Sequence, residues 1–373
     1  MRSQEDQVWY HVDVNSAYLS WTAAYRVCIL GEDLDLRDIP SVIGGSEAER
    51  HGIVLAKSGS AKRYGIRTGE TLAEARCKCP GLVIVPPDYS LYVGCSKALV
   101  ELLKKYFPHV HQYSIDEAFC RVEGTKGLWG THTAFAHQLK EEIRRELGFT
   151  VNIGVSDCKL LAKMASEFQK PDQVHTLFTW EIERKMWPLP VSDLFWVGPA
   201  TVRKLGALGI RTIGELAVMD LELLKRHLKK QGEFIWNYAN GRDVSPFLRE
   251  LPRNKGYGNS MTTPFDVTDR ETAWQVILSL TETVCARLRA DGMEAACVGI
   301  SITDREFRHG SVQTTLISAT DTTLEIYEAA RSLFDRLWNY SPIRRMGVYT
   351  SKVSPKGHYQ YQLFDRGLHD KYS

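Results

Sequence analysis

The sequence predicts an α+β protein of several domains, with two β-α-β-β-α-β units and a helical segment between them. Strand-like and helix-like runs alternate over residues 8–177 and alternate again over 253–352. The intervening residues 178–241 are helical in composition. The chain has 373 residues, which is enough for about two to four domains with apolar cores of their own.

The composition is that of an ordinary globular protein, with 43% hydrophobic and 25% charged residues. The net charge of +2 is compatible with a nucleic-acid partner but does not require one. None of the eight cysteines forms a CxxC pair, so we expect free thiols in a reducing, cytoplasmic compartment. The N-terminus has no apolar segment and no run reaches ~18 apolar residues, so a membrane span is not expected.

The first unit opens with the strand "VWYHVDV", after which Asn15 or Ser16 can cap a helix. Two short strands ("IPSVIGG", "GIVLAKSG"), two short helices and the strand "LVIVPPD" are expected next. They are followed by a helix at 89–108 and a strand pair around "YSIDEAFCRV". The unit then continues with a helix at 131–147, the strand "FTVNIGVS" and the helix "CKLLAKMASEFQK". A β-α-β-β-α-β order of this kind is the ferredoxin-like arrangement.

The second half of the chain begins with helices and returns to alternation after a linker at 242–252, which is rich in Pro and Arg. The second unit is expected to contain strands at 256–263, 295–303, 308–316 and 344–352, with helices at 270–290 and 322–339. The last residues, 353–373, form a polar tail.

Two adjacent acids, Asp116 and Glu117, interrupt the strand-like run "YSIDEAFCRV". Neighbours on a strand point to opposite faces, so an uninterrupted strand would bury one acid without a partner. We therefore predict that both lie in a tight turn between two strands and project the same way. Asp13 ends the first strand, which neighbours the third strand in a ferredoxin-like fold, so it can lie beside Asp116. The alternative is that each acid is a solvated turn residue.

Three converging carboxylates cannot all stay ionised without cations, and Mg²⁺ is the natural partner for oxygen ligands. Two such ions would suit in-line phosphoryl transfer. Lysines on or after the helix that precedes "QKPD", Lys163 and Lys170, could neutralise a bound triphosphate, and Gly59 and Lys62 in "SGSAKRYG" could form an anion site. The alternative is that these lysines are solvated residues on helix faces.

The run "WVGPATVRKLGALGIRTIGELA" (196–217) predicts a helix-hairpin-helix. Gly198 lets backbone N–H groups approach a phosphate, and Arg203 and Lys204 follow on the helix. The alternative is a plain αα-hairpin. In the tail, "QYQLF" (360–364) suggests a peptide that docks into a groove through Gln360, Leu363 and Phe364, and the alternative is a tail that packs on its own domain.

Together these motifs resemble a Y-family translesion DNA polymerase over roughly residues 8–352, similar to the bacterial polymerase IV and polymerase V catalytic-subunit branches. The resemblance implies a palm at 1–18 and 86–177, fingers at 19–85, a thumb with the helix-hairpin-helix at 178–241, the linker at 242–252, a little finger at 253–352 and a tail at 353–373 with a clamp-binding peptide.

The resemblance also implies roles for individual residues. The metal ligands would be Asp13, Asp116, Glu117 and the carbonyl of Val14. Tyr18 matches the steric gate against ribonucleotides, with the small Ala17 beside it, and Lys170 matches a triphosphate-binding lysine. Gly59 and Lys62 stand where many members carry a Tyr-x-x-Arg pair that contacts the nucleotide.

The predicted little finger carries twelve Arg and Lys against twelve Asp and Glu, so its net charge is zero. Contact with DNA must therefore come from segregated charge, such as Arg305 and Arg308 or Arg253 and Lys255, and from backbone amides. The segment "QYQLF" is similar to the peptide that binds the bacterial sliding clamp, which fits a weakly processive polymerase that needs a tether.

The predicted function is template-directed transfer of a dNTP onto a primer 3′-OH in primer-template DNA, with two Mg²⁺ ions for which Mn²⁺ can substitute. Low fidelity, no proofreading and a monomeric enzyme are expected. One alternative is a catalytically silent scaffold that binds DNA and the clamp, against which the presence of Asp13, Asp116 and Glu117 argues. Another, a cyclase on a similar sheet, leaves the helix-hairpin-helix and the tail unexplained.

Overall fold

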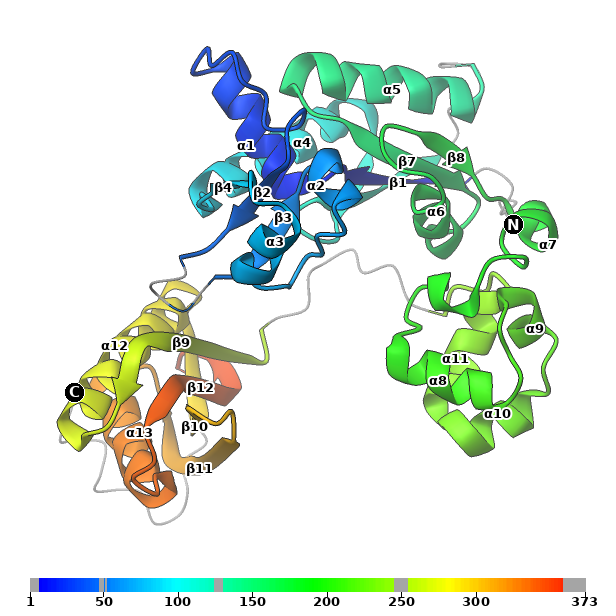
Figure 1. The fold of residues 1–373 in the computed structure, drawn as a ribbon. Helices are drawn as coiled ribbons and strands as arrows, with labels where there is room; N and C mark the ends of the chain where they lie inside the picture. The colour runs from blue at the N-terminus through cyan, green and yellow to red at the C-terminus, as the bar shows by residue number, and fades with distance from the viewer. Residues whose placement is uncertain (1–6, 47–49, 51, 124–129, 245–253, 358–373) are drawn as a thin grey trace. The chain divides into compact units, whose positions relative to one another are not determined.

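The computed structural model describes residues 7–46, 50, 52–123, 130–244 and 254–357 (Figure 1). The chain divides into two compact units, one formed by Met1–Gly45 and Ile53–Arg249 and the other by Ser46–Gly52 and Glu250–Ser373. Within the described ranges, no helix is long and apolar enough to cross a membrane. All eight cysteines are free, as the lack of a pairing pattern predicted.

The first unit is built on a five-stranded sheet with the order β5-β6-β1-β7-β8. Its strands are β1 (Gln7–Val14), β5 (His109–Gln112), β6 (Glu117–Glu123), β7 (Val151–Ser156) and β8 (Val174–Thr176). The helices α4 (Tyr89–Tyr106) and α5 (His132–Leu147) cover one face, and α6 (Lys159–Ser166) packs on the other (Figure 1). The four strands from β5 to β7 have the predicted ferredoxin-like order, and β1 lies next to β6.

Alternation along β1 divides its side chains between the two faces of the sheet. Tyr10 and Val12 lie in the apolar core with α4 and α5, and neither is exposed to solvent. Trp9 contacts the α6 side instead, in a small cluster with Phe119 and Ala162. The residues that alternate with Tyr10 and Val12 therefore share the α6 face, and Asp13 is one of them.

The first helix of the chain is α1 (Ala17–Cys28). The part of the chain that follows α1 and precedes α4 forms a small three-stranded sheet. Its order is β3-β2-β4, with β2 (Ser41–Gly44), β3 (Val54–Lys57) and β4 (Val83–Val85). The short helices α2 (Gly59–Arg63) and α3 (Leu72–Lys78) pack on it around a separate apolar cluster. Ser58 caps α2 and Thr71 caps α3 through side-chain hydrogen bonds, which fixes where each helix begins.

The helical segment of this unit has two short helices at the place predicted for the helix-hairpin-helix, and its apolar core also includes residues of α6. Its α-helices are α7 (Ile182–Lys185), α8 (Pro199–Ala207), α9 (Ile213–Ala217), α10 (Leu221–Leu228) and α11 (Lys230–Ala239). Gly198 is the N-cap of α8 and Pro199 is its first residue, a position that tolerates the missing N–H. Thr212 and Glu215 form a capping box at the start of α9.

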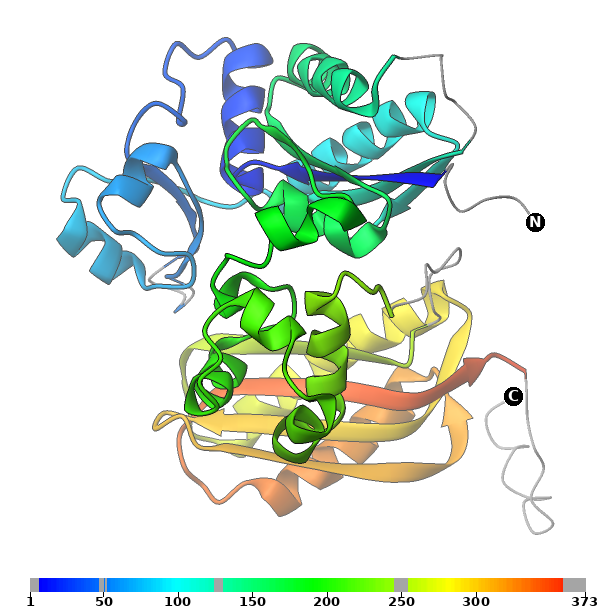
Figure 2. The same ribbon diagram turned by 90° about the vertical axis from the view of Figure 1, so that its right-hand side faces the viewer.

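The second unit contains a four-stranded antiparallel sheet with the order β11-β10-β12-β9. Its elements are β9 (Gly256–Val267), α12 (Arg270–Ala290), β10 (Met293–Asp304), β11 (His309–Thr320), α13 (Thr323–Leu337) and β12 (Ile343–Pro355). Both helices pack on the same face of the sheet (Figure 2). The element order is the predicted one, but the first strand lies at the edge and not inside the sheet, so the topology differs from the first unit.

The prediction for the adjacent acids needs one correction. Glu117 is not in the turn but is the first residue of β6, and only Asp116 lies in the turn before it. The backbone N–H groups of Tyr113 and Ser114 both donate to the carbonyl of Glu117, at 2.9 and 3.2 Å, which closes the turn one residue earlier than predicted. The linker beyond residue 244 and the peptide at 360–364 lie outside the described residues.

The close packing of α6 on the sheet depends on Gly154 in β7. A Cβ atom there would lie 1.9 Å from the carbonyl oxygen of Ala162 and 2.6 Å from the backbone nitrogen of Ser166. We predict that Gly154→Ala forces α6 away from the sheet and lowers the free energy of unfolding by about 1–3 kcal/mol or more, measured by urea denaturation.

Gly94→Ala in α4 is the matched control, because a Cβ at Gly94 meets no atom within 4 Å. In that helix interior alanine should stabilise by roughly 0.5–1 kcal/mol. An equal effect of the two substitutions would contradict the argument from close packing.

Candidate active site

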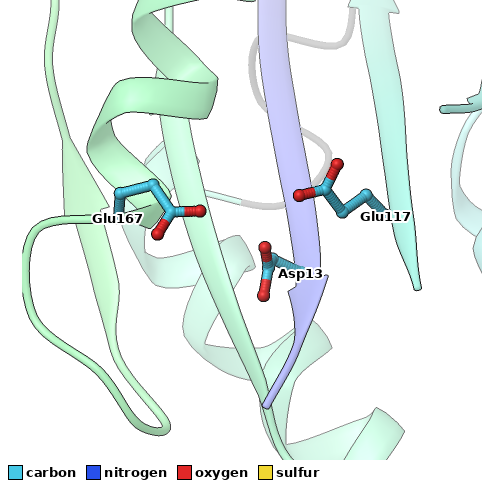
Figure 3. Close-up of side chains that lie close together, drawn as sticks. All are labelled: Asp13, Glu117 and Glu167. Carbon is cyan, nitrogen blue, oxygen red and sulfur yellow. The ribbon is translucent and has the colours of Figure 1, made fainter. Parts of the chain in front are cut away.

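The acids at the end of β1 and at the start of β6 are brought together by the register of these two strands. Asp13 and Glu117 are directly opposite each other in the antiparallel pair β1–β6. Opposite residues of such a pair project from the same face, with Cβ atoms ~5 Å apart. Glu167, just after α6, completes a cluster in which one carboxylate oxygen from each residue lies within 4.8 Å of the others (Figure 3).

Asp13 is the buried member of this cluster, with 7% of its surface exposed. Burial raises the pKa of Asp13 to about 7, Lys170 opposes the rise, and the carboxylates of Glu167 and Glu117 add to it. Like charges that are directly opposite in a sheet destabilise it, so this arrangement requires a cation.

Two lysines supply positive charge to the cluster. The Nζ atom of Lys163, which is buried in α6, lies 2.7 Å from a carboxylate oxygen of Glu117. The Nζ atom of Lys170 lies 3.1 Å from Asp13 and 3.0 Å from Glu167. Burial opposes the effect, but Asp13 and Glu167 raise the pKa of Lys170. Both ammonium groups therefore lie within ion-pair distance of the acids and compensate their charge.

The loop that carries Lys170 is fixed by a pair of buried asparagines. Asn15 Oδ1 accepts from the backbone N–H of Asp172 at 2.7 Å, and its Nδ2 donates to Asn152 Oδ1 at 3.2 Å. Asn152 Nδ2 in turn donates to the carbonyl of Gln169 at 2.6 Å. Asn15 and Asn152 thus hold the loop on both sides of Lys170, a role that the sequence did not indicate.

His11 is another residue of the site that the sequence analysis missed. It is fully buried, its Nδ1 lies 2.7 Å from Ser166 Oγ, and its Nε2 faces Glu117 at 4.0 Å. Burial and the charges of Lys163 and Lys170 lower the pKa of His11, so the ring is neutral. The signal was its spacing: residues i and i+2 of a strand share a face, and His11 stands two residues before Asp13.

Asp116 lies close by but outside the three-carboxylate cluster. Its carbonyl accepts from the backbone N–H of Val14 at 3.1 Å, which ties the turn to the end of β1. Ser114 Oγ donates to its carboxylate at 2.7 Å. The structure therefore joins Asp13 with Glu117 and Glu167, and it leaves Asp116 facing a neighbouring cavity.

That cavity has a volume of about 450 Å³ and lies between the end of β1 and the small sheet. Tyr18, in the first turn of α1, stacks on Tyr92 with ring centroids 4.5 Å apart and planes 6° apart. Ring stacking fixes the orientation of Tyr18 at the cavity wall. The residues that line it are Ser16, Ala17, Tyr18, Leu55, Ala56, Lys57, Ser58, Gly59, Lys62, Thr68, Ile115 and Asp116.

The other predicted residues are not members of this three-carboxylate cluster. Gly198 begins the hairpin helix α8, on which Arg203 and Lys204 are exposed. In the second unit Arg305 is exposed, while Arg308 pairs with Asp304 at 2.6 Å and with Glu306 at 2.7 Å, which neutralises much of its charge. Lys255 is exposed, and Arg253, Gln360, Leu363 and Phe364 lie outside the described residues.

Comparison with known proteins agrees with this site. Residues 12–167 match the impB/mucB/samB family, and residues 254–363 match the C-terminal domain of the same family. The chain is 45% identical over 360 residues to DNA polymerase IV of Clostridium acetobutylicum, covering 96% of this chain and 90% of the relative. It is 35% identical to DNA polymerase IV 2 of Bacillus subtilis, with 96% and 88% covered.

The chain belongs to the impB/mucB/samB family of Y-family DNA polymerases. A solved Y-family DNA polymerase chimera of Dbh and Dpo4 has the same fold, with a TM-score of 0.77 at 19% identity over 93% of this chain and 99% of the chimera. The predicted family, fold class and enzyme class, a DNA-directed DNA polymerase of the translesion type, are thereby confirmed. Membership of the family and the acidic cluster together indicate metal-dependent catalysis on a DNA template with dNTPs.

If Asp13 ligates the metal, its raised pKa makes the affinity for metal depend on pH. A metal ion binds the ionised carboxylate, so a proton competes with it below pH 7. We predict that the affinity for Mn²⁺, measured by isothermal titration without DNA or nucleotide, falls about tenfold from pH 8 to pH 6. An affinity that does not change over this range would contradict the assignment of Asp13 as a metal ligand with a pKa near 7.

Proposed function

We propose that this polymerase extends a DNA primer by nucleotidyl transfer at Asp13, Asp116 and Glu117 with two Mg²⁺ ions, for which Mn²⁺ can substitute. The observation that carries the proposal is the cross-strand pair of Asp13 and Glu117, two carboxylates held face to face by the sheet register. With Glu167 they form the one cluster of three or more metal-ligating side chains in the described part of the chain.

The donor set fits hard divalent cations. Carboxylate oxygens are the ligands that Mg²⁺ prefers. A nearby cation would also stabilise the ionised form of Asp13, which burial disfavours. When bound, the ions would lower the pKa of the primer 3′-OH and neutralise charge that develops on the triphosphate. Asp13, Asp116 and the carbonyl of Val14 would hold them, with Glu117 on the side of the 3′-OH.

The chain's own side chains position the nucleotide in this proposal. Lys170 and Lys62 contact the triphosphate as point charges. Tyr18 lies under the sugar and excludes a 2′-OH, and the small Ala17 leaves room beside it. Because only one acidic cluster is found among the described residues, a second site for exonuclease chemistry has no support, and we propose synthesis of low fidelity without proofreading.

The proposed domain assignment follows the same reasoning. The five-stranded sheet serves as the palm, the small sheet with α2 and α3 as the fingers, the helices from α7 to α11 as the thumb, and residues 253–352 as the little finger. Backbone N–H groups at Gly198, with Arg203 and Lys204, would contact DNA phosphates. In the little finger Arg305 is the better candidate for a phosphate contact, because carboxylates already pair with Arg308.

A cytoplasmic, monomeric enzyme remains the expectation for the polymerase. The alternative of a silent scaffold that binds DNA and the clamp does not account for a cluster of three carboxylates around the buried Asp13. Primer extension by the full chain distinguishes the two functions.

We predict that Glu117→Gln lowers the rate of primer extension by at least about a thousandfold, because it removes one of the carboxylates that hold the metal. The fold should survive, since the uncharged side chain relieves repulsion with Asp13. Glu101→Gln on the exposed surface of α4, where Glu101 pairs only with Lys104, is the control and should extend normally. Extension by the Glu117 variant at the wild-type rate would refute the proposed site, and an inactive wild-type chain would favour the scaffold.

We predict that Tyr18→Ala increases the incorporation of ribonucleotides relative to deoxyribonucleotides, because the ring no longer blocks a 2′-OH. Tyr92→Phe removes only a hydroxyl from the stacked partner and should leave sugar selectivity nearly unchanged. Competition between UTP and dTTP in single-nucleotide insertion measures the effect. Unchanged selectivity in Tyr18→Ala would place the sugar-discriminating residue elsewhere.

The peptide Gln360–Phe364 is proposed to bind the bacterial sliding clamp through Gln360, Leu363 and Phe364. We predict that deletion of 360–364 leaves basal primer extension intact and abolishes its stimulation by a clamp loaded on the same template. A control chain that ends at residue 365 keeps the peptide and should keep the stimulation. Loss of basal activity after the deletion would show instead that the peptide packs on the polymerase itself.

A further inference from the structure

Lys57 is a cavity residue to which no role has yet been given. It is the last residue of β3, in which Val54 and Ala56 are buried and Leu55 and Lys57 are half-buried. Alternation therefore places Leu55 and Lys57 on one face of the strand, and both line the cavity next to Tyr18. Lys62 lines the same cavity from α2, so two lysines of the small sheet region reach one space.

The charge of Lys57 is not neutralised by an acid. Its Nζ atom donates to Thr68 Oγ1 at 3.2 Å, a neutral partner. Within the described part of the chain, no carboxylate lies within 4.0 Å of the Nζ atom of Lys57 or of Lys62. Glu70, which follows on the chain after both lysines, pairs with Lys78. This contrasts with Lys163 and Lys170, each of which is paired with a carboxylate of the cluster.

The two ammonium groups also lie close enough to affect each other. Burial lowers the pKa of Lys57, the charge of Lys62 lowers it further, and Glu70 opposes them. Two mutually repelling cations that line one cavity are stabilised by an anion between or beside them. Asp116 lines the same cavity, so the lining combines one carboxylate with two ammonium groups. A polyphosphate that carries divalent cations matches both kinds of charge.

The side of the cavity near α2 has room for such a ligand. Gly59 begins that helix, and a Cβ atom added there would meet no atom within 4 Å. The cavity is therefore open beside Gly59, and Lys57 lines the same space from the neighbouring strand.

We propose that Lys57 binds the triphosphate of the incoming nucleotide together with Lys62. The proposal rests on the polymerase function proposed above and assigns to the fingers a second cation that faces the ligand from β3. As a compact point charge on a flexible stem, Lys57 can follow the phosphate oxygens while Thr68 holds its ammonium group in the free enzyme.

The test compares Lys57→Met with Lys62→Met and with a control, Lys97→Met, which alters an exposed lysine of α4. Methionine keeps the length of the side chain and removes the charge. Binding of inorganic tripolyphosphate in Ca²⁺ is measured by isothermal titration with the full chain, and the Kd of each of the four dNTPs is measured by single-turnover extension.

We expect Lys57→Met to weaken tripolyphosphate and all four dNTPs by about tenfold, the scale of one charge-assisted hydrogen bond. Lys57→Arg should recover most of the affinity because it restores the charge. Lys97→Met should change neither measurement, and equal melting temperatures of the variants would exclude a folding defect.

Unchanged affinity for tripolyphosphate in Lys57→Met would overturn the proposal. A loss that appears with one base and not with others would overturn it as well, because Lys57 would then contact the base or the template. A wild-type chain that does not extend primers would refute the polymerase function, whereas the tripolyphosphate titration would still decide whether Lys57 binds a polyphosphate.

Discussion

The repulsion between Asp13 and Glu117 is the constraint around which the first unit is arranged. The register of two antiparallel strands fixes these carboxylates opposite each other, and burial makes the charge of Asp13 costly. No local rearrangement can separate them without slipping the strand and turning its apolar side chains out of the core. The compensation therefore has to come from other elements, and it comes from Lys163 and Lys170.

The helix α6 links core packing to this electrostatic compensation. Gly154 lets the helix lie against β7, and Ser166 at its end contacts the buried ring of His11. The same helix carries Lys163 on its inner face, and the chain that leaves it carries Glu167 and Lys170. The position of three charged groups is thus determined by how closely one short helix packs on a sheet. A change in the packing of α6 on β7 would therefore move the charged groups that contact the carboxylates.

Much of the fold could be predicted from the sequence, because periodic apolar residues and capping residues mark the helices and strands. The helix at 270–290 and the helix at 131–147 were predicted to within a residue of their observed ends. The turn before β6 was predicted at 116–117, but it spans residues 113–116 and Glu117 already belongs to β6, since the paired backbone bonds to the carbonyl of Glu117 leave no local trace in the sequence. Glu167 was not predicted as a neighbour of Asp13, because its place depends on the asparagine-bound loop that follows α6 and not on any periodicity.

The ion pair of Lys170 with Asp13 joins the residue proposed to bind phosphate to the residue proposed to bind metal. Lys170 cannot hold that carboxylate and a phosphate at full strength together. A cation that occupies Asp13 releases the ammonium group for phosphate, and phosphate that attracts the ammonium group leaves Asp13 open to a cation. By thermodynamic reciprocity each ligand then raises the affinity of the other. In the proposed site, the ion pair would therefore make the binding of metal and of nucleotide cooperative.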